Sequence, residues 1–146
     1  VLIPWEHKLG PDHVAEFMLP WYENLIDHCR SCGVEAILVD TDGDCTLLIP
    51  LFLSVGVDAL MPFEVQAGMN VVQIGSEYPS LGIMGGINKR ALREGREEIR
   101  REVDRVMPAF LDRGGFIPTL DHTVPPDVSF RNFQYYLECV RSYERK

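Results

Sequence analysis

The chain has 146 residues, of which 46% are hydrophobic and 25% are charged, as expected for one soluble globular domain. Its formal net charge of −8 argues against a nucleic-acid backbone or an anionic membrane as the main partner. No apolar run approaches the ~20 residues that cross a bilayer. The start at Val1, without Met or a basic leader, suggests a cytoplasmic piece of a longer chain.

A long helix is predicted between Pro11 and Gly33, because proline suits a first helical position and glycine a helix end. Pro20 should kink it, since the ring clashes with the carbonyl of the preceding turn. We expect one broad apolar face, made of Val14, Phe17, Met18, Trp21, Tyr22, Leu25, Ile26 and Cys29. Cys29 and Cys32 form a CxxC late in this helix, and we expect all four cysteines to be reduced cytosolic thiols.

Four units follow, each made of a short apolar strand and then a helix. Strands are predicted at 35–39, 57–61, 81–84 and 116–120, and helices at 45–55, 70–77 and 95–111 and after Ser129, which caps the last one. The strands begin about 21 to 35 residues apart, which fits right-handed βαβ crossovers and a parallel sheet.

An acidic turn follows the first strand. Asp40 and Asp42 are two residues apart, so on an extended backbone their side chains point the same way. Asp44 is a good N-cap for the helix at 45–55, and Gly43 can turn the chain at either sign of φ. One alternative is that these acids only cap the helix and face water. However, like charges this close need compensation, which favours a site.

Polar residues also follow the other three strands. Glu64 lies just past the second strand, and His122 lies in a proline-stiffened loop after the fourth. Gly85, Gly86 and Lys89 follow the third, where paired glycines let N–H groups approach a ligand and the lysine suits an anion. A plain tight turn and a surface histidine are the respective alternatives.

These candidates lie at the carboxyl ends of strands, as catalytic residues do in (β/α)8 barrels. A whole barrel has eight strands and ~250 residues, and this chain supplies four strands. The predicted fold class is α/β, with residues 1–146 forming one domain, the C-terminal half of a TIM barrel, whose N-terminal half is absent. Open sheet edges and an apolar inner face predict a homodimer.

Four segments together resemble the uroporphyrinogen decarboxylase superfamily, and the resemblance runs from Trp5 to Tyr143. They are Asp40-Thr-Asp-Gly-Asp, Pro62-Phe-Glu-Val-Gln-Ala-Gly-Met-Asn, Met84-Gly-Gly-Ile-Asn-Lys and Ile117-Pro-Thr-Leu-Asp-His-Thr-Val-Pro-Pro-Asp-Val. Their order matches the C-terminal half of that family's TIM barrel. The resemblance implies one of two activities. One branch decarboxylates uroporphyrinogen without a cofactor, and the other uses zinc to move methyl groups between corrinoid proteins and thiols or other acceptors.

The two branches imply different site residues. In the decarboxylase branch a histidine follows the last strand, and His122 occupies that position. In the methyltransferase branch the zinc ligands correspond to Asp40, Asp42 and His122, of which none is the family's residue. Two carboxylates and an imidazole suit a harder ion than thiolates do, so a divalent metal such as zinc at these three residues, with Glu64 nearby, is a hypothesis. The expected roles are acid/base or ligand for His122, polar or metal binding for Asp42 and orientation for Glu64.

Three functions therefore stay open. The first is an enzyme of this superfamily that acts on a tetrapyrrole or a methylated small molecule, with a corrinoid protein as partner in the methyl-transfer branch. The second is a tetrapyrrole- or corrinoid-binding module without turnover. The third is an inactive half-domain, because a barrel site draws residues from strands around the whole ring.

Overall fold

The computed structural model of the chain describes residues 10–144, so the beginning of the family resemblance, at 5–9, lies outside the described part. A four-stranded sheet forms its centre, in the order β1-β2-β3-β4 with every pairing parallel. The strands are β1 (Leu38–Thr41), β2 (Ala59–Pro62), β3 (Gly82–Met84) and β4 (Phe116–Ile117). The predicted α/β class with four parallel strands is confirmed.

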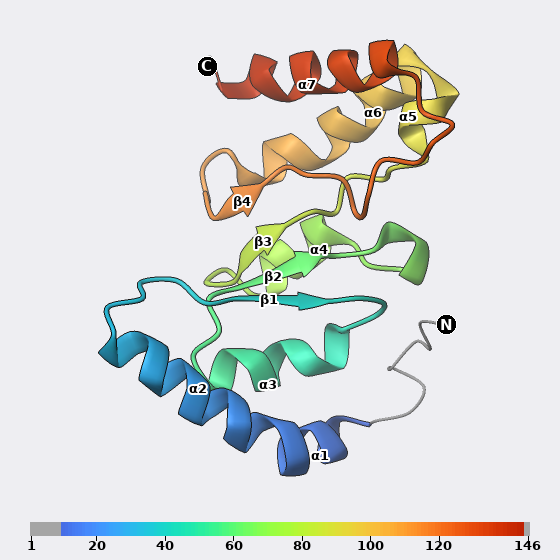
Figure 1. Cartoon of the computed structure of the whole chain (residues 1–146). Coiled ribbons are helices and arrows are strands. Elements are labelled where there is room, and N and C mark those ends of the chain that lie inside the picture. Colours follow the sequence, from blue (N-terminus) through green and yellow to red (C-terminus); the bar gives the residue numbers. More distant parts are fainter. Residues whose placement is uncertain (1–9, 145–146) are drawn as a thin grey trace.

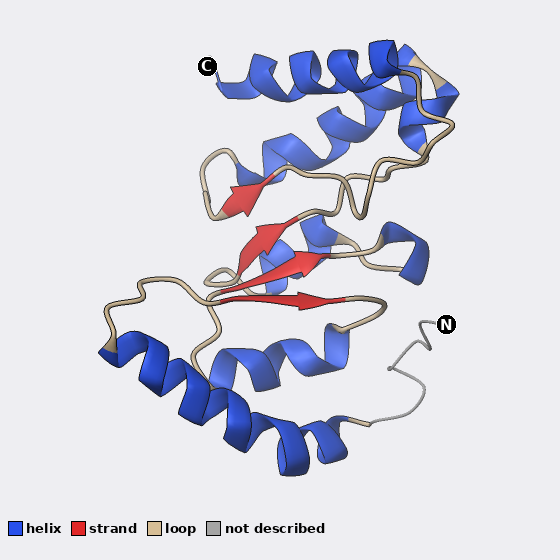
Figure 2. Ribbon diagram, in the orientation of Figure 1, coloured by secondary structure: helices blue, strands red, loops and turns tan. Residues whose placement is uncertain are grey.

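Helices join and flank these strands (Figure 1). They are α1 (Pro11–His13), η2 (Val14–Met18), α2 (Leu19–Ser31), η3 (Thr46–Leu48), α3 (Ile49–Ser54), η4 (Val65–Ala67), α4 (Val71–Glu77), α5 (Ala91–Glu94), α6 (Arg96–Val106), η5 (Met107–Phe110) and α7 (Phe130–Glu144). α2 and α3 lie along β1, while α6 and α7 lie beyond β4 at the other edge, with the strands between them coloured red in Figure 2. This arrangement is that of a partial TIM barrel.

Two sequence-based expectations about the first helix need correction. The predicted kink at Pro20 takes the form of a π-helical turn, η2, in which the Leu19 N–H donates to the carbonyl of Val14, five residues back. The predicted apolar face is also only half buried. Val14 and Ile26 are buried, whereas Phe17, Trp21 and Leu25 form an exposed row, with Trp21 76% exposed. Helical spacing identifies both rows as apolar but does not say which one has a partner.

Strand boundaries differ from the predicted ones at both edges of the sheet. β1 begins three residues later than expected and runs to Thr41, so Asp40 is a strand residue opposite Met61 and does not lie past the strand end. β4 is shorter than predicted, and an isolated parallel bridge between Ile87 and Leu120 continues its line. The shift at β1 matters for the site, because it separates the surroundings of Asp40 from those of Asp42.

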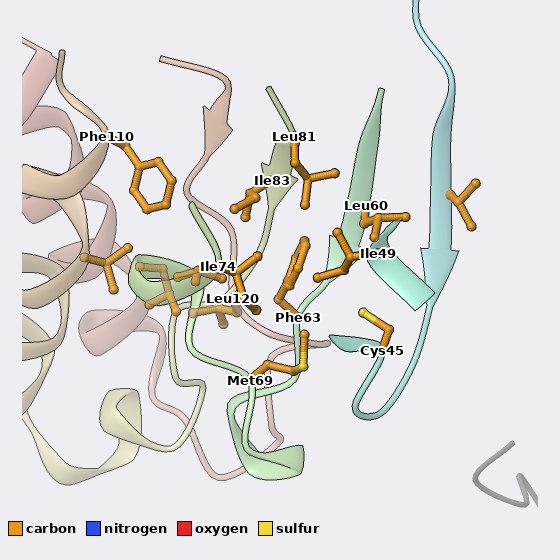
Figure 3. Packing of buried hydrophobic residues seen from close by; sticks show 14 of the residues in the cluster. Cys45, Ile49, Leu60, Phe63, Met69, Ile74, Leu81, Ile83, Phe110 and Leu120 are labelled. Carbon is orange, nitrogen blue, oxygen red and sulfur yellow. The ribbon is translucent and has the colours of Figure 1, made fainter. Parts of the chain in front are cut away.

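Alternation along the strands sends one set of side chains to the helices and the other to the open side. Val39, Leu60 and Ile83 align across the sheet and are buried. The same core contains Phe63, which Figure 3 shows among Ile49, Leu60, Ile74 and Leu120. On the opposite face, Leu38 and Ile117 are 46% and 56% exposed and line a hollow of about 370 Å³. Both side chains are exposed, so no helix of residues 10–144 covers this part of the face, which corresponds to the interior of a barrel.

Candidate active site

Three loops after three different strands bring Asp42, Glu64 and His122 together. One potential ligand atom from each of these residues lies within 4.8 Å of those from the other two. Asp42 follows β1, Glu64 follows β2 and His122 follows β4, so the cluster stands at the carboxyl end of the sheet. Asp42 and His122 are exposed, and Glu64 is half-buried. The predicted meeting of the acidic turn, Glu64 and the late histidine at one mouth is therefore present.

Asp40 is placed differently from the other predicted metal ligands. It lies on β1 and lines two hollows, of about 550 Å³ and about 250 Å³, but is absent from the three-residue cluster. Among the residues that the structure describes, Asp42 and His122 thus form a cluster with Glu64. Asp40, which was expected to be the third ligand, is not part of it.

Glu64 is held on both of its carboxylate oxygens. Oε2 accepts a hydrogen bond from the backbone N–H of Gly43, at 3.0 Å, and Oε1 lies 3.8 Å from Nζ of Lys89. Gly43 can offer its N–H in this direction because it adopts φ = 78°, which glycine tolerates without steric cost. Lys89, predicted to bind an anion, therefore already meets one, and its charge offsets part of the repulsion between the site's carboxylates.

The backbone before Glu64 turns at an unexpected residue. Phe63 has φ = 57°, a left-handed conformation that is strained for a bulky side chain. Such strain costs of order 1–3 kcal/mol and needs support from its surroundings. The Phe63 ring supplies that support, because it is buried in the middle of the core (Figure 3). Core packing thus holds the turn that directs Glu64 toward the acidic loop.

The paired glycines, Gly85 and Gly86, allow the ends of neighbouring strands to pack closely. The N–H of Gly85 donates to the carbonyl of Ile117 at 3.1 Å, and that of Gly86 to the carbonyl of Pro62 at 3.0 Å. A Cβ on Gly85 would stand 1.8 Å from the Pro62 oxygen, and one on Gly86 would stand 2.2 Å from a Val71 methyl. These contacts explain the glycines by close packing. Ligand binding by Gly85 and Gly86 stays a prediction. Lys89, the third residue predicted with them, contacts Glu64 of the cluster.

His122 is oriented by the residue that follows it. The backbone N–H of Thr123 donates to Nδ1 at 2.8 Å, so the neutral imidazole carries its proton on Nε2. In the other tautomer, Nδ1–H would exchange this contact for Oγ1 of Thr123, which lies 3.0 Å away. The first tautomer offers a proton to a ligand, and the second frees Nε2 to bind a cation.

A hollow of about 550 Å³ opens beside the cluster. Its polar side is formed by Asp40, Asp42, His122 and two threonines, and the rest of its lining is apolar: Met61, Pro62, Met84, Pro118, Leu120, Val124, Phe133, Tyr136 and Leu137. The Tyr136 hydroxyl donates to the Pro118 carbonyl, so it is not offered to a ligand. No lysine or arginine in the described part of the chain lines this hollow. It therefore fits a mainly apolar body with one polar group at the acidic end.

Comparison with known proteins assigns the family. A family model described as uroporphyrinogen decarboxylase (URO-D) matches residues 4–143. The chain belongs to the uroporphyrinogen decarboxylase family. The match spans nearly the same residues as the sequence resemblance and accounts for the partial barrel.

Two curated relatives match over shorter stretches. A uroporphyrinogen decarboxylase of Hydrogenobaculum sp. (strain Y04AAS1) is 29% identical over 89 residues, which are 61% of this chain and 25% of the relative. A glutamyl-tRNA reductase of Corynebacterium jeikeium (strain K411) is 33% identical over 109 residues, which are 72% of this chain and 20% of that relative. The matches thus cover a quarter or less of either curated protein.

One thiol lies close to the cluster along the chain. Cys45 directly follows the acidic turn, but burial raises the pKa of its thiol to about 12, with a smaller contribution from the negative charge of Asp44. The Cys45 thiol is therefore neutral at neutral pH and is not an activated nucleophile. No helix in the described chain is long and apolar enough to traverse a bilayer.

Proposed function

We propose that this chain supplies the cation-binding side of a URO-D superfamily site that transfers a methyl group from a methylated corrinoid protein to a thiol or similar acceptor. The observation that carries the proposal is the approach of Asp42, Glu64 and His122 to within 4.8 Å of one another, at the mouth of an apolar hollow. The proposal concerns a protein in which further strands complete the barrel, since a barrel site draws on strands around the ring.

The donor set and its spacing fit a divalent cation such as zinc. Zinc binds imidazole nitrogen and carboxylate oxygen at ~2.0–2.2 Å in a tetrahedral arrangement, so two of its ligand atoms lie about 3.3–3.6 Å apart. The ligand atoms of the cluster, within 4.8 Å of one another, would approach by up to about 1.5 Å per pair to reach that spacing. Asp42, Glu64 and His122 would hold the ion, with Lys89 moving away from Glu64. A divalent cation bound there would lower the pKa of a coordinated thiol, which makes the acceptor nucleophilic.

The charge distribution around the hollow favours an acceptor without several carboxylates. Asp40 and Asp42 line the hollow, and Glu64 lies within 4.8 Å of Asp42 without lining it. Lys89 is the cation that the structure pairs with Glu64. Carboxylates at such distances repel anions unless cations compensate them. A polycarboxylate such as uroporphyrinogen is therefore disfavoured relative to a compact thiol with an apolar body.

A second candidate, decarboxylation, is favoured by one specific contact. The Thr123 N–H on Nδ1 leaves a proton on Nε2 of His122, which is the form that protonates a carbon after loss of carbon dioxide. In that function the Nε2–H of His122 is the general acid, and the Thr123 N–H on Nδ1 stabilises the ring that has given up its proton. A tetrapyrrole is the substrate class that the family supports for this alternative.

Cobalt(II) titration separates the two candidates, because its visible absorption bands report the coordination geometry. We expect the chain to bind one Co²⁺ at pH 7.5, and Asp42→Asn, Glu64→Gln and His122→Ala each to weaken binding by at least tenfold. Asp44→Asn is the matched control. Asp44 lies in the same acidic turn but accepts the Thr46 N–H, at 2.9 Å, and is outside the cluster.

Absence of Co²⁺ binding, or equal loss of binding in Asp44→Asn, would refute the cation site and leave proton donation by His122 as the better candidate. In the complete enzyme, the proposal predicts methyl transfer from methylcobalamin to a thiol that His122→Ala abolishes. Binding of cobalamin without transfer would instead identify a carrier module.

A further inference from the structure

Two of the loops that carry the cluster, those after β2 and β4, are joined to the loop of Lys89 by a residue outside the cluster. Asp121 is completely buried, and within residues 10–144 it is the only residue with a charged side chain that is buried from solvent. Its Oδ2 accepts a hydrogen bond from the N–H of Val65 at 3.0 Å, and its Oδ1 accepts one from the N–H of Lys89 at 2.9 Å. Its own N–H donates to the carbonyl of Ile87 at 2.8 Å. One carboxylate after β4 thus binds the loops after both β2 and β3.

The two hydrogen bonds that the Asp121 carboxylate accepts hold the backbone at or next to Glu64 and Lys89. Val65 directly follows Glu64, and Lys89 is itself the partner of Glu64. His122 directly follows Asp121, so movement of the carboxylate also moves the backbone that carries the imidazole. We propose that Asp121 is a positioning residue that sets the distance between Glu64, Lys89 and His122. This inference deepens the proposed cation site and rests on it for its functional meaning.

The chemistry of the contact explains why a carboxylate is needed. Two backbone donors approach two different oxygens, and a buried carboxylate is tolerated only where donors replace water. Asparagine has the same shape but one acceptor oxygen, so its NH2 group would face either the Val65 or the Lys89 N–H. Asp121→Asn should therefore release one of the two loops while leaving the packing volume unchanged.

The test combines Co²⁺ binding with amide hydrogen exchange in the full chain. We expect Asp121→Asn to bind Co²⁺ about 10- to 100-fold more weakly, the usual cost of losing a group that orients ligands, and to alter the visible spectrum of bound Co²⁺. Exchange should accelerate in 63–69, in 85–92 or in both. Asp58→Asn is the matched control, since Asp58 also accepts a backbone N–H, from Ile37 at 2.6 Å, but lies before β2 at the other end of the strand. It should leave Co²⁺ affinity unchanged.

A second variant removes the donor instead of the acceptor. Val65 is the first residue of η4, and Glu64 before it is extended, with φ = −64° and ψ = 110°. Proline is tolerated at a first helical position after an extended residue, and its Cδ takes the place of the N–H proton, so Val65→Pro deletes the donor and displaces the Asp121 carboxylate from it. It should also weaken Co²⁺ binding. It therefore serves as the test if Asp121→Asn does not fold.

The outcomes distinguish this inference from the proposed function. Wild-type affinity in Asp121→Asn together with unchanged exchange in both segments would overturn the positioning role, as would wild-type affinity in Val65→Pro. If the wild-type chain binds no Co²⁺, the cation site fails by itself. Exchange in 63–69 and 85–92 then decides whether Asp121 holds the loops.

Discussion

The close approach of β2 and β3 at Gly85 allows a sharp test of why a glycine stands at the rim of the site. Gly85 and Gly33 both have left-handed φ angles, of 119° and 86°, so alanine is strained at both positions. They differ in space. A Cβ on Gly33 meets nothing within 4 Å, whereas one on Gly85 stands 1.8 Å from the Pro62 oxygen and 3.0 Å from the Pro62 Cα.

The difference between the two variants can be worked out from these contacts. Gly33→Ala should cost about 1 kcal/mol, since left-handed strain of about 1–2 kcal/mol is partly offset by the lower entropy of the unfolded chain. Gly85→Ala must also separate the strand ends. It then loses two backbone hydrogen bonds, from Gly85 to Ile117 and from Gly86 to Pro62, at about 1 kcal/mol each. The total for Gly85→Ala is about 3 kcal/mol.

Urea denaturation followed by far-ultraviolet circular dichroism measures both variants against the wild type. If the free energy of unfolding of Gly85→Ala lies within about 0.5 kcal/mol of that of Gly33→Ala, the close-packing explanation is refuted. The two explanations drawn from the sequence, a tight turn and a ligand contact, would then be the ones left.

Three further predictions concern burial, association and capping. The pKa of Cys45 rises from 9.0 to about 12 in the folded chain, so the stability that its neutral form contributes is complete below pH 9 and is lost as the pH rises toward 12. The stability difference between the wild type and Cys45→Ala in urea should therefore shrink by about 2 kcal/mol from pH 8 to pH 10.5, and a constant difference would contradict this. We propose that a second copy of the chain covers the open face of the sheet, where Leu38 and Ile117 are exposed. Light scattering should then show twice the chain mass of 16.6 kDa for the wild type and the monomer mass for the double variant Leu38→Glu/Ile117→Glu. A monomeric wild type at high concentration would exclude the dimer. Ser129 accepts the Asn132 N–H at 3.2 Å, so Ser129→Ala should lower the free energy of unfolding by about 1 kcal/mol in the same urea assay, and no change would show that the cap is not stabilising.

The elements that sequence reasoning predicted well are those with local causes. Ser129 precedes α7 and caps it, and Asn70 accepts the Val72 N–H at the start of α4, where the predicted helix begins. The four parallel strands follow from short apolar runs separated by helical segments, a pattern typical of parallel pairing through right-handed crossovers. These signals lie within a few residues of the structure that they specify.

The parts of the site that escaped prediction depend on contacts between distant segments. The left-handed turn at Phe63 exists because the core holds its ring, and nothing in the local sequence marks that conformation. Asp121 has the same character. Its sequence neighbourhood does not distinguish it from the exposed acids of the chain, and its burial follows from the meeting of three loops.

The choice between Asp40 and Glu64 shows how a small boundary error changes a predicted site. A strand ending at residue 39 would place Asp40 and Asp42 together beyond the sheet, where both suit one ion. Because β1 runs to Thr41, Asp40 is paired opposite Met61 and lines the hollow, while Asp42 alone reaches the mouth. Glu64 lies beside Asp42 instead, and its position is set by the Gly43 N–H and by Lys89. Strand register and loop contacts therefore decide that Glu64, and not Asp40, joins Asp42 and His122. A variant that moves the loops without changing any of these three residues would test this.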